Sequence, residues 1–202
     1  MTTGSRFAFI DESHGGGPGR PERGRGWRRI RVGGSPPPTR QAEWAALLGF
    51  VLLPLLAGVS AAIVTVPSVH SWYRTLKMPP GTPPGWLFGP VWTVLYISMG
   101  VAAWLVWRRV ARIGATPARL RPLRIWGWQV GVNALWSPAF FGLHGVELGL
   151  LILVPLVALV GWTVQAFRPV STVAAWLLVP YFGWVCYATY LNAGLAVLNP
   201  LR

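Results

Sequence analysis

The sequence predicts an all-α integral membrane protein: a bundle of five transmembrane helices with a proline-rich lid loop between the first two. Charged residues make up only 11% of the chain and hydrophobic residues 53%, whereas about a quarter of the residues in a soluble domain are charged. Apolar segments also recur at the length that a bilayer requires, about 20 residues. A single cysteine, Cys186, excludes a disulfide framework within the chain and a zinc site built from paired cysteines.

The first 42 residues differ sharply in composition from the rest. Residues 1–42 are rich in Gly, Pro and Arg, a composition that buries too little apolar surface to fold, so they are predicted to form a disordered basic cytoplasmic tail. No apolar stretch follows the basic residues, which argues against a secretory signal. Attraction of RGRGWRRIR to anionic lipid is the alternative reading of this tail. Residues 43–200 are predicted to form the membrane domain.

Five apolar segments are predicted to be the membrane helices, at about 44–66, 86–107, 124–143, 146–167 and 171–198. The only internal charge is Glu147, at the very start of the fourth segment, where the helix dipole favours it. Every segment contains a proline, which frees a backbone carbonyl that neighbouring groups must satisfy in lipid. This pattern favours a compact bundle around an interior site, although membrane helices are in general richer in proline than soluble ones.

The distribution of basic residues predicts the orientation in the membrane. With five spans the termini lie on opposite sides, and the side of the amino-terminal tail carries 15 of the 18 basic residues. Positive charge is enriched on the cytoplasmic side, so the amino terminus is predicted to be cytoplasmic and the carboxyl terminus outside. The net charge of +13 is then a matter of topology, and no nucleic-acid partner is predicted.

The outward-facing loop at 68–85 contains two proline pairs, which stiffen it into extended or turn geometry. Its aromatic residues match the interfacial belt of membrane proteins when each is taken alone. Taken together, they favour a lid over the mouth of the bundle. The predicted lid residues are Trp72, Tyr73, Pro83, Pro84 and Trp86.

Polar and aromatic side chains also lie too deep for an interfacial belt. Gln129, Asn133 and Trp136 are spaced i, i+4, i+7 and share one helix face, while Gly127, Gly131 and Ala134 form a small-residue face for packing or dimerisation. At 1.5 Å per residue, side chains of three helices reach roughly 9–15 Å below the outer boundary. Amides at that depth are predicted to face inward, either as interhelical hydrogen bonds worth about 1 kcal/mol each or as part of a pocket for a planar apolar ligand. The predicted ligand-binding residues are Trp92, Tyr96, Gln129, Asn133, Trp136, Phe140, Tyr181, Trp184, Ala188 and Asn192.

Three segments of the chain resemble a known family. WYRTLKMPPGTPPGWLFGPVWTVLYISMG, QVGVNALWSPAFFG and PYFGWVCYATYLNAGLAVLN, in this order, are similar to the TspO/MBR family of tryptophan-rich sensory and translocator proteins. The resemblance covers residues 44–199 and implies a five-helix bundle that often dimerises and binds porphyrins, haem-pathway intermediates or sterols beneath the first loop. By position, Trp92 and Trp184 match two tryptophans associated with porphyrin photochemistry, and Asn133, Trp136 and Ala188 match pocket positions.

The chain departs from the family pattern in the lid and near its carboxyl end. Gly81 stands where members usually carry an aromatic residue, and Met78 replaces a lysine, so the lid is less aromatic. LNAGLAVLNP lacks the Tyr and Arg of the cholesterol-recognition pattern, which does not support sterol binding by that motif.

We therefore expect a membrane sensor or regulator that binds a tetrapyrrole, with protoporphyrin IX or haem as ligand and no obligatory cofactor or metal. No acid–base pair or nucleophile arrangement predicts a conventional enzyme; light-dependent porphyrin breakdown through Trp92 and Trp184 is the one chemistry that the resemblance suggests. His70 and His144 are expected to be solvated loop residues rather than haem ligands. The alternatives are a small transporter of porphyrin or other hydrophobic cargo, for which Glu147 is the only candidate proton carrier, and a dimeric membrane scaffold.

Overall fold

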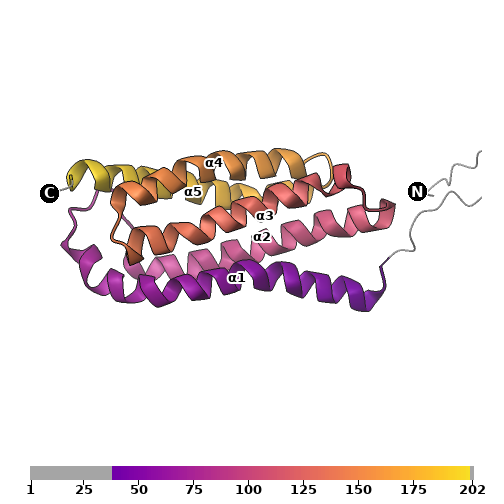
Figure 1. Ribbon diagram of the computed structural model, residues 1–202, viewed down its shortest axis with the longest axis horizontal. Coiled ribbons are helices and arrows are strands. Elements are labelled where there is room, and N and C mark those ends of the chain that lie inside the picture. Colours follow the sequence, from indigo (N-terminus) through magenta and orange to yellow (C-terminus); the bar gives the residue numbers. More distant parts are fainter. Residues whose placement is uncertain (1–37, 201–202) are drawn as a thin grey trace, which may run out of the picture.

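The computed structural model describes residues 38–200, so the predicted tail lies outside the described residues up to position 37. All the regular secondary structure in residues 38–200 is helical (Figure 1). In chain order the elements are α1 (Arg40–His70), η1 (Trp72–Thr75), α2 (Gly85–Ile113), α3 (Pro117–Ser137), η2 (Pro138–Gly142), α4 (Val146–Phe167) and α5 (Thr172–Leu198).

The five long helices match the predicted count, and α4 has the predicted bounds. The helices α1 and α2 extend past their predicted bounds at both ends, and α3 both begins and ends earlier than predicted, because apolar runs report only the part of a helix that suits lipid. The first helix begins at Arg40, inside the predicted tail, where the Thr39 side chain accepts a hydrogen bond from the Ala42 amide at 3.3 Å. The helix α2 continues through three arginines to its last residue, Ile113, and is terminated by Gly114, whose φ is +89°.

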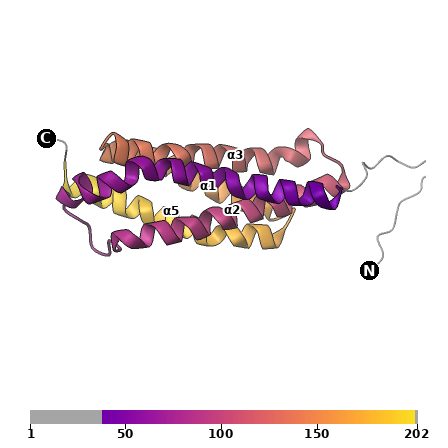
Figure 2. The same ribbon diagram turned by 90° about the horizontal axis from the view of Figure 1, so that it is seen from below.

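The third helix differs most from its prediction. It begins at Pro117, seven residues earlier than expected, with Thr116 as its N-cap and proline in the first turn. Four helices, α1, α2, α4 and α5, are long and apolar enough to cross a membrane. The third helix does not meet that measure, because its first half is rich in arginine. Even so, α3 runs alongside the others and packs on α4, α1 and α2 (Figures 1 and 2).

The helices form an elongated bundle in which α2 lies close to α1 and α5 and α4 packs against both α3 and α5. The core is apolar and centred on α2, where Met99, Ala102 and Val106 are fully buried. The first two helices touch backbone to backbone: a Cβ added to Gly100 would lie 2.5 Å from the Cα of Val51. Only glycine permits this approach.

At the end of α3 the chain forms a short π-helical turn, η2, in which the Leu143 amide donates to the Pro138 carbonyl at 3.0 Å. The wider turn directs Phe140 and Phe141 into the bundle, where both are buried. It also presents the Phe141 carbonyl to α1, and the Ser68 hydroxyl donates to it at 2.7 Å.

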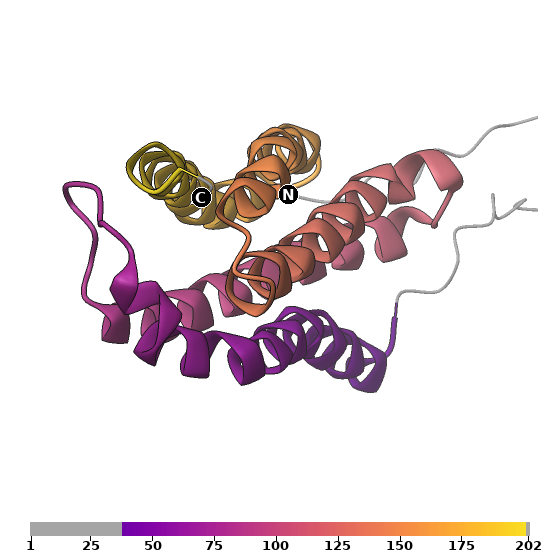
Figure 3. The same cartoon turned by 60° about the vertical axis from the view of Figure 1, so that its left-hand side comes forward.

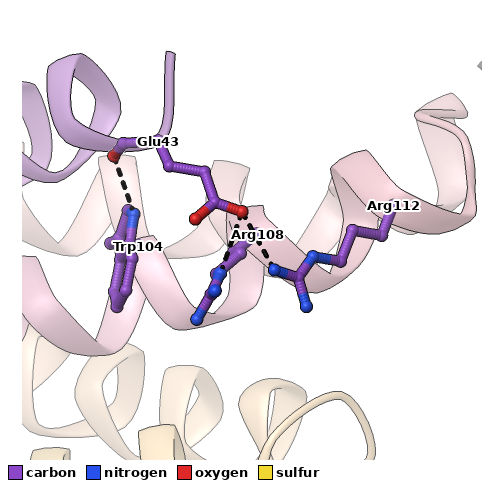
Figure 4. A network of polar contacts seen from close by, with 4 residues as sticks. All are labelled: Glu43, Trp104, Arg108 and Arg112. Atoms are coloured by element: carbon purple, nitrogen blue, oxygen red, sulfur yellow. Dashed lines mark hydrogen bonds and ion pairs between the residues drawn. The ribbon is translucent and has the colours of Figure 1, made fainter. Parts of the chain in front are cut away.

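The two ends of the bundle are chemically distinct. We call the end that contains the start of α1 and the connection between α2 and α3 the arginine end, and the opposite end, with residues 71–84, the loop end. At the arginine end one carboxylate oxygen of Glu43 accepts from Arg108 at 3.1 Å and from Arg112 at 3.0 Å (Figure 4). The Trp104 indole donates to the Glu43 carbonyl at 3.0 Å, so α1 is fastened to α2 there.

At the loop end, residues 71–84 leave α1 and extend towards the end of α5 before they enter α2 (Figure 3). The Tyr190 hydroxyl donates to the Pro80 carbonyl at 3.1 Å, and the Tyr187 hydroxyl donates to the Gly81 carbonyl. The Asn199 side chain bonds the Lys77 backbone at both its N–H, 2.9 Å, and its carbonyl, 3.0 Å. The loop is therefore held to α5 by four hydrogen bonds.

Candidate ligand-binding cavity

A cavity of about 900 Å³ lies at the loop end, bounded by α1, α2, α3 and residues 71–84. This volume is at the upper end of the usual range for small-molecule sites. The α1 side is formed by Leu55, Gly58, Val59, Ala61, Ala62, Thr65, Val66, Val69 and His70. The α2 side is formed by Gly85, Trp86, Phe88, Gly89, Trp92, Thr93 and Tyr96. The α3 and η2 side is formed by Asn133, Ala134, Trp136, Ser137 and Phe141.

The back wall is flat and aromatic. The rings of Trp92 and Tyr96, one turn apart on α2, are stacked with centroids 5.2 Å apart and an interplanar angle of 28°. Trp136 of α3 continues the wall, 6.4 Å from Trp92. Its own position is fixed from behind by stacking on Phe140 at 5.4 Å and by an indole hydrogen bond to the side-chain oxygen of Asn192 at 3.4 Å.

One amide lies in this wall. The Tyr96 hydroxyl donates to the Asn133 side-chain oxygen at 3.3 Å, which joins α2 to α3. Both polar groups are thereby satisfied within an otherwise apolar surface. The Thr65 and Ser137 hydroxyls form a further hydrogen bond between α1 and α3 at the cavity edge.

The wall on α1 contains a group of small residues, Gly58, Ala61 and Ala62. A Cβ on Gly58 would lie 2.3 Å from the Cε2 atom of Tyr96, so the tyrosine ring occupies the space above a glycine. Val59 and Val66 are 65% and 55% exposed on this helix, and Trp86 is 73% exposed on α2. The cavity is consequently bordered by lipid-accessible side chains of both helices.

The loop contributes the remaining wall through Tyr73, Arg74, Met78, Thr82 and Pro83. Two cationic or titratable side chains, His70 and Arg74, lie at this rim, with the Arg74 Nη2 atom 3.4 Å from His70 Nδ1. Every other lining residue is uncharged. The cavity thus combines an apolar interior with a basic edge.

Of the ten predicted ligand-binding residues, Trp92, Tyr96, Asn133 and Trp136 line this cavity, as do three of the residues predicted for a lid, Tyr73, Pro83 and Trp86. Ala134, predicted for a packing face, lines it as well. Pro84 instead caps the start of α2. Trp72 stacks on His144 with ring centroids 4.5 Å apart, outside the cavity.

The other six predicted residues lie elsewhere. Gln129 is fully buried one turn further towards the arginine end, where its amide contacts Met99 Sδ at 3.5 Å, because the helices close against each other there. Tyr181 is fully buried behind Trp92, and Trp184 packs on Phe88, which does line the cavity. The remaining three, Phe140, Ala188 and Asn192, line a separate pocket of only about 30 Å³.

Asn192 has a structural position in the bundle. Its Nδ2 donates to the Val146 carbonyl at 2.7 Å at the start of α4, while its oxygen accepts from Trp136. A Cβ on Gly149 would lie 2.7 Å from that oxygen, so α4 must carry glycine there. This amide joins α3, α4 and α5.

Sequence reasoning missed the entire α1 side of the cavity. The signal was present in the run AGVSAA, residues 57–62, where small residues accumulate in an otherwise bulky apolar helix. By contrast, Gly127 and Gly131 lie on an exposed face of α3, with nothing within 4 Å of a Cβ added to either. Within residues 38–200 no group of three His, Cys, Asp or Glu side chains is placed to hold a metal ion.

In comparisons with known proteins, the family model and the similar proteins agree with each other. Residues 50–198 match the model of the TspO/MBR family. The chain is 34% identical to the translocator protein of Bos taurus over 159 residues, which cover 79% of this chain and 93% of that protein. It is 34% identical to the tryptophan-rich protein TspO of Archaeoglobus fulgidus, covering 76% and 96% of the two chains. It is 39% identical to the protein CrtK of Rhodobacter capsulatus, covering 71% and 86%.

Proposed function

The chain belongs to the TspO/MBR family of integral membrane proteins, and from this premise we propose that it is a membrane sensor or regulator that binds a tetrapyrrole in the cavity at its loop end. The observation that carries the proposal is the flat aromatic wall of Trp92, Tyr96 and Trp136. Protoporphyrin IX or haem is the expected ligand.

The shape and chemistry of the cavity support a planar ligand. Indole and phenol faces gain stacking energy from a flat aromatic body in addition to the burial of apolar area. The volume of about 900 Å³ accommodates a macrocycle, which the smaller pocket of about 30 Å³ does not. The Asn133 amide and the basic rim supply the few polar points that orient a ligand in such a site.

Titration of the purified protein with protoporphyrin IX in the dark tests this proposal. The protein is placed in lipid nanodiscs, and empty nanodiscs of the same composition are titrated in parallel to measure partition into lipid. We expect saturable quenching of the protein's tryptophan fluorescence. The ligand's own fluorescence should also change saturably with the protein present, whereas in empty nanodiscs it should change without saturating. Linear changes that are equal with and without protein would contradict tetrapyrrole binding.

A light-dependent breakdown of the bound porphyrin is part of the same proposal. Trp92 borders the cavity, whereas Trp184 reaches it only through Phe88, with ring centroids 6.1 Å apart. With dioxygen as the oxidant of the light-excited porphyrin, Trp92 would stack on the ligand, and Trp184, behind Phe88, would pass an electron to Trp92. Illumination in air tests this: loss of porphyrin absorbance faster than in empty nanodiscs supports breakdown, and equal rates contradict it.

A small transporter is the second candidate, and the exposed borders of the cavity on α1 and α2 favour it. Val59, Val66 and Trp86 give a hydrophobic cargo a sideways path between the cavity and the bilayer. Porphyrin flux into proteoliposomes distinguishes transport from sensing. A pH gradient that drives flux in the wild type but not in Glu147→Gln would favour a proton-coupled transporter.

We also propose a homodimer in a bacterial cell membrane, with the amino terminus in the cytoplasm and the carboxyl terminus outside. The exposed, open face around Gly127 and Gly131 admits close approach of a second helix. Replacement of Gly131 by Leu is expected to shift the protein from dimer to monomer in light-scattering measurements. An unchanged mass would exclude this face as the dimer contact, and a monomeric wild type would exclude the scaffold function.

A further inference from the structure

We infer that Arg74 makes the rim of the cavity a carboxylate-binding subsite, which orients a planar apolar ligand by an acidic group at its edge. This inference rests on the proposed function and assigns to one residue of that site the recognition of the ligand's carboxylates. It depends on the position of Arg74, a residue to which neither the family resemblance nor the aromatic wall assigns a role.

Arg74 lies in η1, immediately after α1, and its side chain lines the cavity from the loop side. The Arg74 Nη2 atom donates to Nδ1 of His70, one helical turn earlier, at 3.4 Å. This contact uses one of the five N–H groups of the guanidinium and leaves the others for a ligand.

The charge of Arg74 has no acidic partner among residues 38–200. The two ion pairs in this part of the chain both belong to Glu43, at the arginine end. The other acidic side chain, Glu147, lies in the first turn of α4 and pairs with no basic residue. Arg74 is therefore a cation beside an apolar cavity that a bound anion would complement.

A carboxylate matches this site better than an uncharged polar group does. The planar fork of arginine donates two parallel hydrogen bonds to the two oxygens of a carboxylate, and such charge-assisted bonds are about twice as strong as neutral ones. Because Arg74 is exposed, it loses little hydration when an anion arrives. A macrocycle whose apolar body stacks on the back wall would place its edge carboxylates at the rim, whereas a sterol would gain nothing from this charge.

Lys77 provides a matched control in the same loop. It carries the same charge three residues away, but it does not line the cavity, and its backbone is bonded to Asn199. A general effect of positive charge on the loop surface would change similarly with either residue. A local subsite depends on Arg74 alone.

The test compares protoporphyrin IX, a dicarboxylic acid, with its uncharged dimethyl ester, in nanodiscs of phosphatidylcholine. Wild type, Arg74→Gln, Arg74→Lys and Lys77→Gln are titrated with each ligand in the dark. For Arg74→Gln we expect affinity for the acid to fall about three- to tenfold and affinity for the ester to change less than about twofold. We expect Arg74→Lys to recover part of the loss, because it restores the charge without the fork. Lys77→Gln should behave like the wild type.

Equal loss of affinity for acid and ester in Arg74→Gln would overturn the subsite, as would equal losses in Arg74→Gln and Lys77→Gln. Unchanged affinity for the acid in Arg74→Gln would also overturn the subsite, while leaving tetrapyrrole binding in the cavity intact. Failure of wild-type protein to bind either ligand saturably would reject the proposed function and this inference together.

Discussion

The Tyr96 hydroxyl on α2 donates to the side-chain oxygen of Asn133 on α3 at 3.3 Å, and both residues line the cavity. The bond places a polar junction between two helices within the wall that the ligand is proposed to contact. It also holds the Tyr96 ring over Gly58, so the three helices that surround the cavity meet at this point.

Tyr96→Phe removes one hydrogen-bond partner and preserves the ring. We expect the protein to lose about 1 kcal/mol of stability, because the Asn133 amide is left with an unmet acceptor in an apolar wall. The double variant Tyr96→Phe, Asn133→Leu should lose less than the sum of the two single variants, since it removes both partners. Thermal unfolding in detergent measures this, and strictly additive losses would contradict the coupling.

Gly58→Ala tests the close contact between α1 and α2. The added methyl group would lie 2.3 Å from Tyr96 Cε2, so the ring must move into the cavity or the helices must separate. We expect protoporphyrin IX affinity to fall by about tenfold, which corresponds to about 1.4 kcal/mol. An affinity equal to that of the wild type would contradict this prediction, because it would mean that the Tyr96 ring shifts without filling the cavity.

Gly89→Ala is the matched control for that substitution. Gly89 also lines the cavity on a helix, but nothing lies within 4 Å of its added Cβ. We expect less than about a twofold change in affinity and a small gain in stability from the better helix propensity of alanine. A loss as large as that of Gly58→Ala would mean that any added methyl group disturbs the site.

The hydrogen bonds between residues 71–84 and α5 predict how fast a ligand exchanges. Tyr187→Phe with Tyr190→Phe removes the bonds to the Gly81 and Pro80 carbonyls and should release the loop. We expect faster ligand dissociation in stopped-flow measurements and faster amide hydrogen exchange in the loop. Tyr181→Phe, on the same helix but without a hydrogen bond to the loop, is the control. Unaltered dissociation in the double variant would show that the loop does not limit exchange.

Glu43→Gln tests the fastening of α1 at the arginine end. The substitution removes the charge that Arg108 and Arg112 share, so we expect a lower unfolding temperature in dilute buffer. The difference from wild type should shrink in 1 M salt, where the Debye length is about 3 Å, compared with about 30 Å at 0.01 M. Protoporphyrin IX affinity should not change, because the cavity lies at the opposite end. A difference that is independent of salt would mean that packing, not charge, is responsible.

The sequence predicted the helices well because each apolar run has the length of a bilayer, and α4 was located to the residue. It located α5 to within one residue and missed the polar turns that extend past the lipid, as at Arg40 and in the arginine-rich start of α3. A run of hydropathy carries no information about such extensions, whereas the capping residues Thr39 and Thr116 do.

The cavity was predictable only in part. Helix periodicity grouped Asn133 and Trp136, which line one cavity, but it also placed Gln129 on the same stripe, and periodicity does not show that the helices close together around Met99. Depth arithmetic brought Asn192 to the level of Trp136, which is consistent with their hydrogen bond, yet it could not distinguish an interhelical contact from a cavity wall. The small residues of α1 are a weaker signal than polar ones, because they also suit ordinary packing between membrane helices.

The most direct test of the central claim is where protoporphyrin IX binds, measured in the dark by fluorescence titration of Trp92→Phe against Trp184→Phe. Trp92 lines the cavity, whereas Trp184 lies behind Phe88. Binding in the cavity predicts that Trp92→Phe weakens affinity by about three- to tenfold, from the loss of a stacking face, and that Trp184→Phe binds like the wild type. Equal affinity in all three proteins, or a loss confined to Trp184→Phe, would contradict a tetrapyrrole site between α1, α2 and α3.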